Sequence, residues 1–177
     1  MTGNEPAAIA FIGVGSNLAD PLVQVRQALI ELESIPGTRV TARSSLYRTS
    51  PVGYLEQPDF INAVASVQTT LKPQALLAAL LAIENRHGRR RTMRNAPRTL
   101  DLDLLLFGVA CVDAPELTLP HPRLHERAFV LAPLAEIAPE LRDPRSGHTV
   151  AEIIRALPEP PSVRRVGPLA PAETRFL

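Results

Sequence analysis

Short apolar runs alternate with longer apolar stripes along this chain. Residues 8–14 and 60–67 are runs of small or β-branched residues, and residues 39–47 alternate polar with apolar positions. Both patterns are typical of strands. Residues 100–107 form a further apolar run that is short enough for a buried strand. The pattern predicts four strands, and residues 109–112 are expected to form the arm of a hairpin after the fourth.

Four segments have helical patterns. A helix should begin near Asp20, because aspartate is a good N-cap and the proline that follows suits the first helical position. The clearest apolar face covers residues 72–87, and residues 125–141 and 149–157 predict two more helical segments. Residues 88–96 show no periodicity, so we expect a mobile loop there.

Length and composition indicate one domain. The 177 residues suit a domain at 1–157, followed by a proline-rich tail at 158–177 that is too polar and broken to pack independently. A net charge of +1 gives no overall attraction to nucleic acid or membranes. The single cysteine, Cys111, excludes an internal disulfide, and we expect a small, partly buried side chain. No apolar stretch approaches the roughly eighteen residues of a membrane span, so we expect a cytoplasmic protein.

Two carboxylates stand out in the last apolar run. Asp101 and Asp103 are two positions apart, and side chains alternate across a strand, so both should point to the same side. Such a pair would repel unless something positive compensates it. Mg²⁺ is the natural candidate, because it takes oxygen ligands from carboxylates and substrate phosphates. The alternatives are an exposed strand face or a pair of turn caps.

Arginines precede this pair. No acidic residue separates Glu84 from Asp101, and six arginines occupy the interval: Arg86, Arg89, Arg90, Arg91, Arg94 and Arg98. Guanidinium groups bind phosphate oxygens bidentately and keep their charge. Arginines beside metal-binding aspartates suggest a polyphosphate ligand, although arginine runs are also common on solvated surfaces.

Three other polar residues could contact a ligand. Asn62 lies in a predicted strand, where asparagine is disfavoured, and its amide could pair with a heterocycle or satisfy a turn. Glu84 lies in a last helical turn, where the helix dipole disfavours a carboxylate, so a ligand or a nearby arginine should compensate it. His121 stands between two prolines, where it could donate to a phosphate or lie on the surface; His87, at a helix end, is expected to cap the helix.

Six motifs follow one another along the chain. They are VGSNL at 14–18, YRTSPVG at 47–53, QPDFIN at 57–62, GR at 88–89, PRTLDLD at 97–103 and PHP at 120–122. In order and approximate spacing they resemble 6-hydroxymethyl-7,8-dihydropterin pyrophosphokinase, an enzyme family of folate biosynthesis. The match covers about residues 8–157, and its most specific segment is PRTLDLD.

The resemblance implies a fold, a reaction and a site. The fold would be a ferredoxin-like α+β sandwich, a mainly antiparallel sheet with helices packed on it. The enzyme would transfer pyrophosphate from ATP to the pterin's hydroxymethyl group and release AMP. Asp101 and Asp103 would hold two Mg²⁺ ions, and with Arg89 and Arg98 they form the expected catalytic set. ATP would contact Leu77, Glu84, Arg89, Arg91, Arg94, Arg98, Leu104, Thr118, His121 and Arg127. The pterin would contact Thr49, Ser50, Pro51, Val52, Gly53, Phe60, Asn62, Asp101 and Phe129, lying between the two phenyl rings.

The chain departs from the family pattern in two places. Asn95-Ala96 replaces the usual Trp-Gly, so the aromatic lid over the pterin is absent and we expect weaker sealing of the substrate with the chemistry retained. Pro122 stands where some members have tyrosine, so a contact from that hydroxyl is unavailable.

Other classes of function make different predictions. A Walker-type ATPase is excluded, because the chain has no GxxxxGK segment and its one lysine is Lys72. A module that binds RNA through its basic loop is disfavoured by the few aromatic residues. A non-catalytic interaction domain would tolerate loss of Asp101 and Asp103. We expect a monomer whose partners are small molecules, without nucleic acid or membrane.

Overall fold

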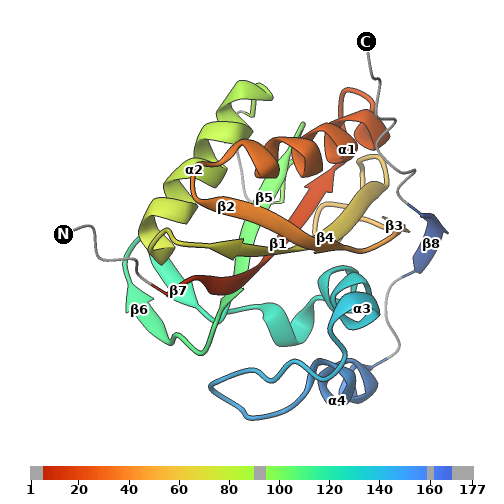
Figure 1. The fold of residues 1–177 in the computed structure, drawn as a ribbon. Helices are drawn as coiled ribbons and strands as arrows, with labels where there is room; N and C mark the ends of the chain where they lie inside the picture. Colours follow the sequence, from red (N-terminus) through yellow and green to blue (C-terminus); the bar gives the residue numbers. More distant parts are fainter. Residues whose placement is uncertain (1–5, 90–94, 159–161, 169–177) are drawn as a thin grey trace.

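An antiparallel sheet with helices on both faces forms the centre of the structure (Figure 1), a computed structural model that describes residues 6–89, 95–158 and 162–168. Its strands follow the order β5-β1-β4-β3-β8, and β2 pairs with β4 beside β3. β6 and β7 form a separate hairpin. The strands are β1 (Ala8–Ser16), β2 (Thr38–Arg43), β3 (Leu46–Thr49), β4 (Phe60–Thr69), β5 (Asp101–Phe107), β6 (Val112–Ala114), β7 (Leu117–Leu119) and β8 (Val163–Gly167). This confirms the predicted α+β class and its mainly antiparallel sheet.

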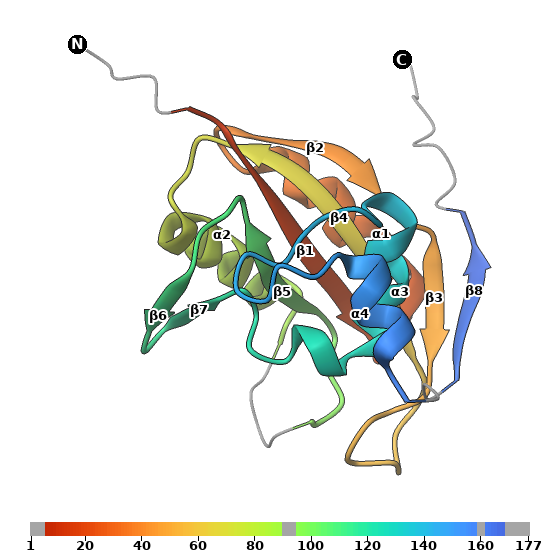
Figure 2. The same ribbon diagram turned by 90° about the horizontal axis from the view of Figure 1, so that it is seen from below.

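Helices cover the sheet in two pairs. α1 and α2 lie on one face, and α3 and α4 lie on the other (Figure 2). The helices are α1 (Pro21–Glu31), α2 (Pro73–Arg86), α3 (Ala128–Ile137) and α4 (Val150–Ala156), with short 3-10 turns at Leu32–Ser34 and Leu124–Glu126. As predicted, Asp20 caps α1 and a proline occupies the first turn of α1 and of α2. No helix in the described ranges is long and apolar enough to cross a membrane.

Alternation along the central strands divides the core between the two faces. On β1, Ile12 and Val14 pack with α1 and α2, whereas Phe11 packs with α3 and α4. On β5, Leu102 and Leu104 belong to the first cluster. Asp101 and Asp103, which alternate with these leucines, therefore face the side of the sheet that α3 covers.

The expected strand at 39–47 is two strands. β2 ends at Arg43, and β3 begins at Leu46. The break lies at Ser44, whose Oγ accepts a hydrogen bond from the Val64 backbone N–H at 2.9 Å. A side-chain oxygen has thus taken the place of a backbone carbonyl in the ladder, which alternation of polar and apolar residues does not reveal.

Two further expectations on element bounds and one on burial were wrong. α3 begins at Ala128 and ends at Ile137, earlier than expected, because Ala138 precedes a proline and leaves the helical region with φ −151°. The hairpin arm is β6, not residues 109–112. Cys111 is exposed and not partly buried.

Part of the segment after Pro158 joins the sheet. Residues 163–167 form β8, which pairs antiparallel with β3. Proline and charge predicted a tail too polar and broken to pack independently, and β8 instead adds to an existing sheet edge, where a strand needs few apolar contacts of its own. The expected mobile loop at 88–96 falls largely on residues 90–94, outside the described ranges.

Candidate active site

Asp101 and Asp103 lie side by side at the start of β5. They pair with Gly15 and Gly13 of β1, and their side chains are 20% and 29% exposed. Both carboxylates border the same cavities, so the prediction that they point to one side is confirmed.

Arginines from three segments converge on this pair. Arg89, beyond the end of α2, donates to Asp101 and to Glu84. Arg98 Nη1 donates to Asp101 Oδ2 at 2.6 Å, and Arg127 Nη1, just before α3, donates to Asp103 Oδ2 at 2.9 Å. The arginines thus lie around the carboxylates as expected. Arg89 and Arg98 precede β5 in the sequence, and Arg127 follows it. Arg91 and Arg94 lie outside the described residues.

The two carboxylates differ in their electrostatic environment. Burial would raise the pKa of Asp101, but the charges and hydrogen bonds of Arg98 and Arg89 lower it overall. Burial and the charge of Asp101 raise the pKa of Asp103, against the opposing effect of Arg127. Asp103 therefore carries negative charge that its protein neighbours compensate incompletely.

A hard cation fits this pair if a ligand completes its coordination. Within the described ranges, no group of three or more His, Cys, Asp or Glu side chains is placed to hold a metal ion. Two carboxylates are a usual protein contribution to a Mg²⁺ site whose other oxygens come from water and phosphate. The incompletely compensated charge on Asp103 favours such an ion.

An aromatic cavity lies on one side of Asp101. Its lining residues come from β1, β3, β4, the loop after β3, the segment before β5 and the start of α3. They are Gly15, Thr49, Ser50, Val52, Gln57, Phe60, Asn62, Asn95, Arg98, Asp101, Arg123, Glu126, Arg127, Ala128 and Phe129. Most of the expected pterin contacts are among them, whereas Pro51 and Gly53 are not.

Cations lie against both phenyl rings of the aromatic cavity. The Arg98 guanidinium is 5.7 Å from the centre of the Phe60 ring, and the Arg127 guanidinium is 5.7 Å from that of Phe129. Both distances suit cation–π contact. Arg98 and Arg127 therefore bridge the carboxylates and the aromatic cavity.

Asn62 is fixed inside the aromatic cavity. Its Nδ2 donates to Thr49 Oγ1 at 2.7 Å, and its Oδ1 lies where a Cβ on Gly15 would come within 2.7 Å. Among the described residues, no hydrogen-bond donor reaches that Oδ1. Asn62 therefore offers an oriented acceptor, which suits the heterocycle role predicted for it.

A second cavity, which we call the α2–β5 cavity, lies on the other side of the aspartates. It is lined by Leu77, Leu81, Glu84, Arg89, Asp101, Leu102, Asp103, Leu104, Pro115, Glu116, Leu117, Thr118, His121 and Pro122. Six of the expected ATP contacts are here: Leu77, Glu84, Arg89, Leu104, Thr118 and His121. Arg98 and Arg127 line the aromatic cavity instead.

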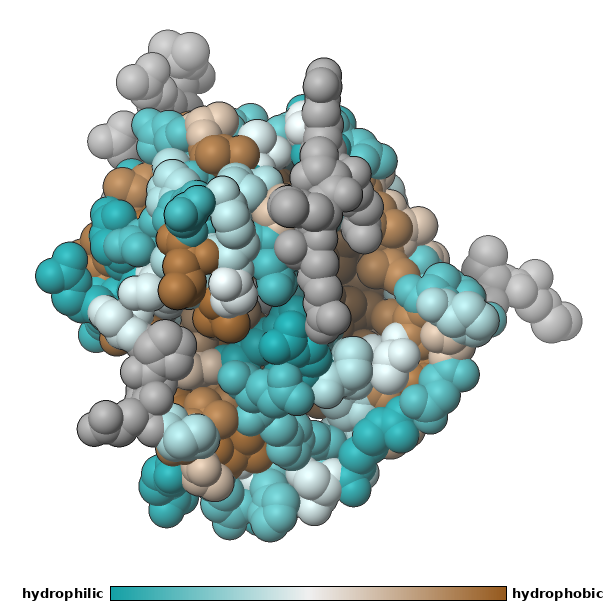
Figure 3. All heavy atoms as spheres, turned by 180° about the vertical axis from the view of Figure 1, so that it is seen from behind, coloured by the Kyte–Doolittle hydropathy of each residue, from teal (hydrophilic) through white to brown (hydrophobic). Residues whose placement is uncertain are grey.

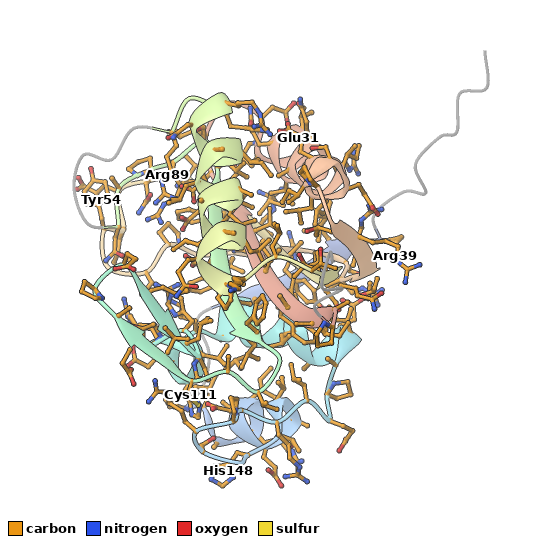
Figure 4. The ribbon with its side chains drawn as sticks, turned by 60° about the vertical axis from the view of Figure 1, so that its left-hand side comes forward. Glu31, Arg39, Tyr54, Arg89, Cys111 and His148 are labelled. Carbon is orange, nitrogen blue, oxygen red and sulfur yellow. The ribbon has the colours of Figure 1, made fainter. Side chains whose placement is uncertain are left out.

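Glu84 holds Arg89 and β5 in place. Its buried Oε1 accepts from Arg89 and from the backbone N–H of Leu102, the latter at 2.7 Å. The expectation that an arginine compensates this carboxylate is confirmed. Figure 4 shows Arg89 near the end of α2, on the same side of the molecule as Tyr54 of the loop after β3.

His121 is neutral at physiological pH. Burial and the positive charge of Arg127 lower its pKa to about 4. Its Nδ1 accepts a hydrogen bond from the Arg123 backbone N–H at 3.1 Å, which assigns the proton of the neutral ring to Nε2. The longer 3.5 Å contact of Nε2 with Arg127 Nη1 is then not a hydrogen bond, because a guanidinium can only donate. An Nε2–H at the edge of the α2–β5 cavity can donate to an oxygen ligand. His87, the C-cap of α2 as expected, instead contacts Gln24 and Glu31 of α1.

Two side-chain amides that we did not predict, those of Gln57 and Asn17, brace the aromatic cavity. Gln57 Nε2 donates to the Asn95 carbonyl at 2.9 Å, and Asn17 Nδ2 donates to Gln57 Oε1 at 2.9 Å. Asn17 Oδ1 in turn accepts from the Arg98 backbone N–H at 2.9 Å. Asn17 and Gln57 stand inside the VGSNL and QPDFIN motifs, which was the available signal. Asn95, at the position where the family pattern has tryptophan, thus contacts the loop after β3 through its backbone carbonyl.

The two cavities meet at one place. Asp101 borders both, and Asp103 lies beside it in the α2–β5 cavity. From behind, hydrophilic residues gather at the recessed middle of the molecule, with hydrophobic residues on either side (Figure 3). Two ligands in these cavities would approach each other at the carboxylate pair, which suits transfer of a group between them.

Comparisons with known proteins agree with this geometry. Residues 11–139 match the family model of 7,8-dihydro-6-hydroxymethylpterin-pyrophosphokinase. The chain is 49% identical over 148 residues to the 2-amino-4-hydroxy-6-hydroxymethyldihydropteridine pyrophosphokinase of Pseudomonas aeruginosa, covering 84% of this chain and 91% of the relative. It is 44% identical over 148 residues to the protein of the same name from Bacillus subtilis, covering 83% and 89%.

Solved structures show the same fold. A crystal structure of a Plasmodium falciparum HPPK-DHPS triple mutant with pteroate matches with a TM-score of 0.67 at 14% identity. A second structure of that protein, with STZ-DHP, matches with a TM-score of 0.70 at 14% identity. In each case 87% of this chain is covered, and the chain spans 44% of the solved protein's length.

Proposed function

Because the chain belongs to the 7,8-dihydro-6-hydroxymethylpterin-pyrophosphokinase family, we propose that it transfers pyrophosphate from ATP to the hydroxymethyl group of 6-hydroxymethyl-7,8-dihydropterin, releases AMP and serves folate biosynthesis. The observation that carries the proposal is the position of Asp101 between two cavities of different character. One has two phenyl rings and an oriented amide, and the other has apolar walls and an arginine.

Each cavity suits one substrate. In the aromatic cavity, the pterin lies between Phe60 and Phe129, and Asn62 Oδ1 accepts from an N–H at its edge. In the α2–β5 cavity, the adenosine moiety of ATP packs on Leu77 and Leu104, with Thr118 beside it. The triphosphate then extends toward Asp101 and Asp103, where the hydroxymethyl group meets the β-phosphate.

Asp101 and Asp103 would hold two Mg²⁺ ions together with phosphate oxygens. Bound there, the ions supply charge neutralisation for the phosphates and for the oxygen that leaves with AMP. The aspartates' own part is to keep two ionised carboxylates on one face of a rigid strand. The pKa of Asp101 is lowered by Arg98 and Arg89 against burial, so this carboxylate is charged across the physiological range.

The arginines and His121 bind and orient the triphosphate. Arg89, Arg98 and Arg127 exchange part of their hydrogen bonding with the aspartates for phosphate oxygens as substrates bind, and His121 donates from Nε2. Arg91 and Arg94 belong to the same proposed set. In-line placement of the hydroxyl and the phosphate supplies most of the remaining catalysis.

A direct assay tests the proposal. The chain is incubated with ATP, Mg²⁺ and 6-hydroxymethyl-7,8-dihydropterin, and mass spectrometry follows AMP and the diphosphorylated pterin. We expect both products in equal amounts. ADP with a monophosphorylated pterin, or ATP turnover that does not depend on the pterin, would contradict the proposal.

Four further proposals accompany this function. The chain acts as a monomer, it works in the cytoplasm, and it needs neither nucleic acid nor membrane. The replacement of Trp-Gly by Asn95-Ala96 weakens pterin sealing, because an asparagine side chain covers less apolar surface than an indole ring.

A further inference from the structure

β8 extends the sheet beside the pterin side of the site. It pairs with β3 over four positions, from Leu46 with Gly167 to Thr49 with Val163. The pairing continues into the next loop, because the Ser50 backbone N–H donates to the Ser162 carbonyl at 3.3 Å. Figure 2 shows β8 running alongside β3 at the edge of the sheet. β8 lies beyond residues 11–139, the part that the family model matches.

β3 depends on its neighbours because it is short. It has four residues, of which three are paired with β4: Tyr47, Arg48 and Thr49. Two residues of this region, Thr49 and Ser50, line the aromatic cavity, and Thr49 Oγ1 holds Asn62. Without β8, Thr49 and Ser50 would lie at the end of a four-residue edge strand paired on one side only.

Arg165 anchors β8 to Ser45, the residue before β3, and to Glu136 in the last turn of α3. Its Nε donates to Ser45 Oγ at 2.8 Å, and its Nη2 lies 3.5 Å from Glu136 on α3. Glu136 also accepts from the Ser45 backbone N–H at 3.0 Å and from the Tyr47 hydroxyl at 2.8 Å. α3 carries Phe129 at its first turn. One cluster therefore joins β8, the start of β3 and the helix that presents an aromatic wall.

We propose that β8 is a positioning element for the pterin: through Arg165 and the backbone pairing with β3, it holds residues 49–53 and α3 in the arrangement that binds the ring. The inference rests on the proposed function. It assigns a role in the reaction to a C-terminal segment that touches neither cavity. The α2–β5 cavity is built from other elements, so β8 can affect ATP binding only through Arg127, the residue before α3 that we assign to the triphosphate.

The test compares two neighbouring arginines in the full-length chain. Arg165→Ala removes the contacts to Ser45 and Glu136, whereas Arg164→Ala alters the next residue, which alternates to the other face of β8 opposite Arg48. We expect Arg165→Ala to raise KM for the pterin about two- to fivefold, as for loss of a partly exposed charged contact, with a smaller change in KM for ATP and kcat unchanged. Arg164→Ala should leave all three constants unchanged.

Amide hydrogen exchange measures, without substrate, whether Arg165 stabilises residues 49–53. In Arg165→Ala, the amides of residues 49–53 should exchange faster than in the unchanged chain, and in Arg164→Ala they should not. Equal exchange in Arg165→Ala and the unchanged chain would overturn the inference. An equal rise in KM for the pterin and for ATP would also overturn it. A lack of AMP formation by the unchanged chain would instead overturn the proposed function, so the two failures are distinguishable.

Discussion

The two aspartates of β5 are chemically identical residues whose ionisation affects the fold in opposite directions. For Asp101, arginine charges outweigh burial and lower the pKa, so its ionised form stabilises the fold above its ordinary pKa of 3.8. For Asp103, burial and the charge of Asp101 raise the pKa. A raised carboxyl pKa gives stability that is present below the ordinary value and is lost as pH rises through the folded value. At neutral pH Asp103 therefore costs stability.

Paired amide substitutions test this difference. At pH 7, Asp101→Asn should lower the free energy of unfolding by about 1–2 kcal/mol, because Arg89 and Arg98 lose their charged partner. Asp103→Asn should leave it unchanged or raise it by up to about 1 kcal/mol. Both variants should lose AMP formation. Denaturant unfolding of the substrate-free chain measures the first effect, and equal destabilisation by the two substitutions would contradict the assignment.

Two glycines of β1 provide a second residue-scale prediction. A Cβ on Gly15 would lie 2.7 Å from Asn62 Oδ1, so Gly15→Ala should displace the Asn62 amide and raise KM for the pterin about tenfold, with a smaller effect on ATP. Gly13→Ala is the matched control, since its nearest neighbour is a Leu105 methyl at 3.5 Å, an ordinary contact. Steady-state kinetics with each substrate varied in turn would show the difference, and equal pterin KM in the two variants would argue against it.

Residue patterns predicted that the two aspartates share one face, but they did not predict which arginine contacts each aspartate. Alternation along residues 100–107 was enough to place Asp101 and Asp103 on one side, because strand geometry is local. Which arginine meets which aspartate depends on contacts between distant segments, such as Arg127 with Asp103, and no local pattern specifies these. The amides of Asn17 and Gln57 were missed for the same reason, because Asn17 is 81 residues from Arg98 and Gln57 is 38 residues from Asn95.

At the scale of elements, Glu136 links α3 to the start of β3. Burial would raise its pKa, but hydrogen bonds from Ser45 and Tyr47 lower it below the ordinary 4.5. A lowered carboxyl pKa stabilises the fold above the ordinary value, and this contribution disappears as pH falls through the folded value. Tyr47 responds to pH in the opposite direction. Burial and Glu136 raise its pKa to about 12, so its contribution to the stability of the fold is present below pH 10 and is lost as pH rises toward 12.

Glu136→Gln should therefore reduce stability in a pH-dependent way. We expect the variant to be less stable than the unchanged chain by about 1 kcal/mol at pH 7, and the difference should shrink as pH falls below about 4.5. Urea unfolding at a series of pH values measures it. A difference that stays constant down to pH 3 would show that the carboxylate charge does not stabilise this contact.

The bounds of helices and strands were predicted correctly where signals close by in the sequence determine them. Asp20 and the prolines at helix starts placed α1 and α2 correctly, because capping acts within one turn. The break at Ser44 and the strand at residues 163–167 escaped prediction, since both depend on hydrogen bonds to another strand. β8 in particular has two arginines in five residues, and its pairing partner β3 is more than 100 residues away in the sequence.

At the scale of the whole molecule, the fold and the metal requirement should be separable. The described residues bring two carboxylates to the site, and the core clusters on both faces of the sheet are apolar. EDTA should therefore stop AMP formation completely and reversibly on addition of Mg²⁺. It should leave the unfolding temperature of the substrate-free chain unchanged. A large fall in that temperature would show a structural metal ion instead.

The position of β8 also affects how copies of the chain meet. An open strand edge exposes unpaired backbone N–H and C=O groups to which another polypeptide can add. In this chain β3 is paired by β8, whose exposed Arg164 and Arg165 place positive charge along the new edge. Two such edges repel when they approach, so the last strand that gives β3 a partner also discourages the sheet from growing into a neighbouring molecule.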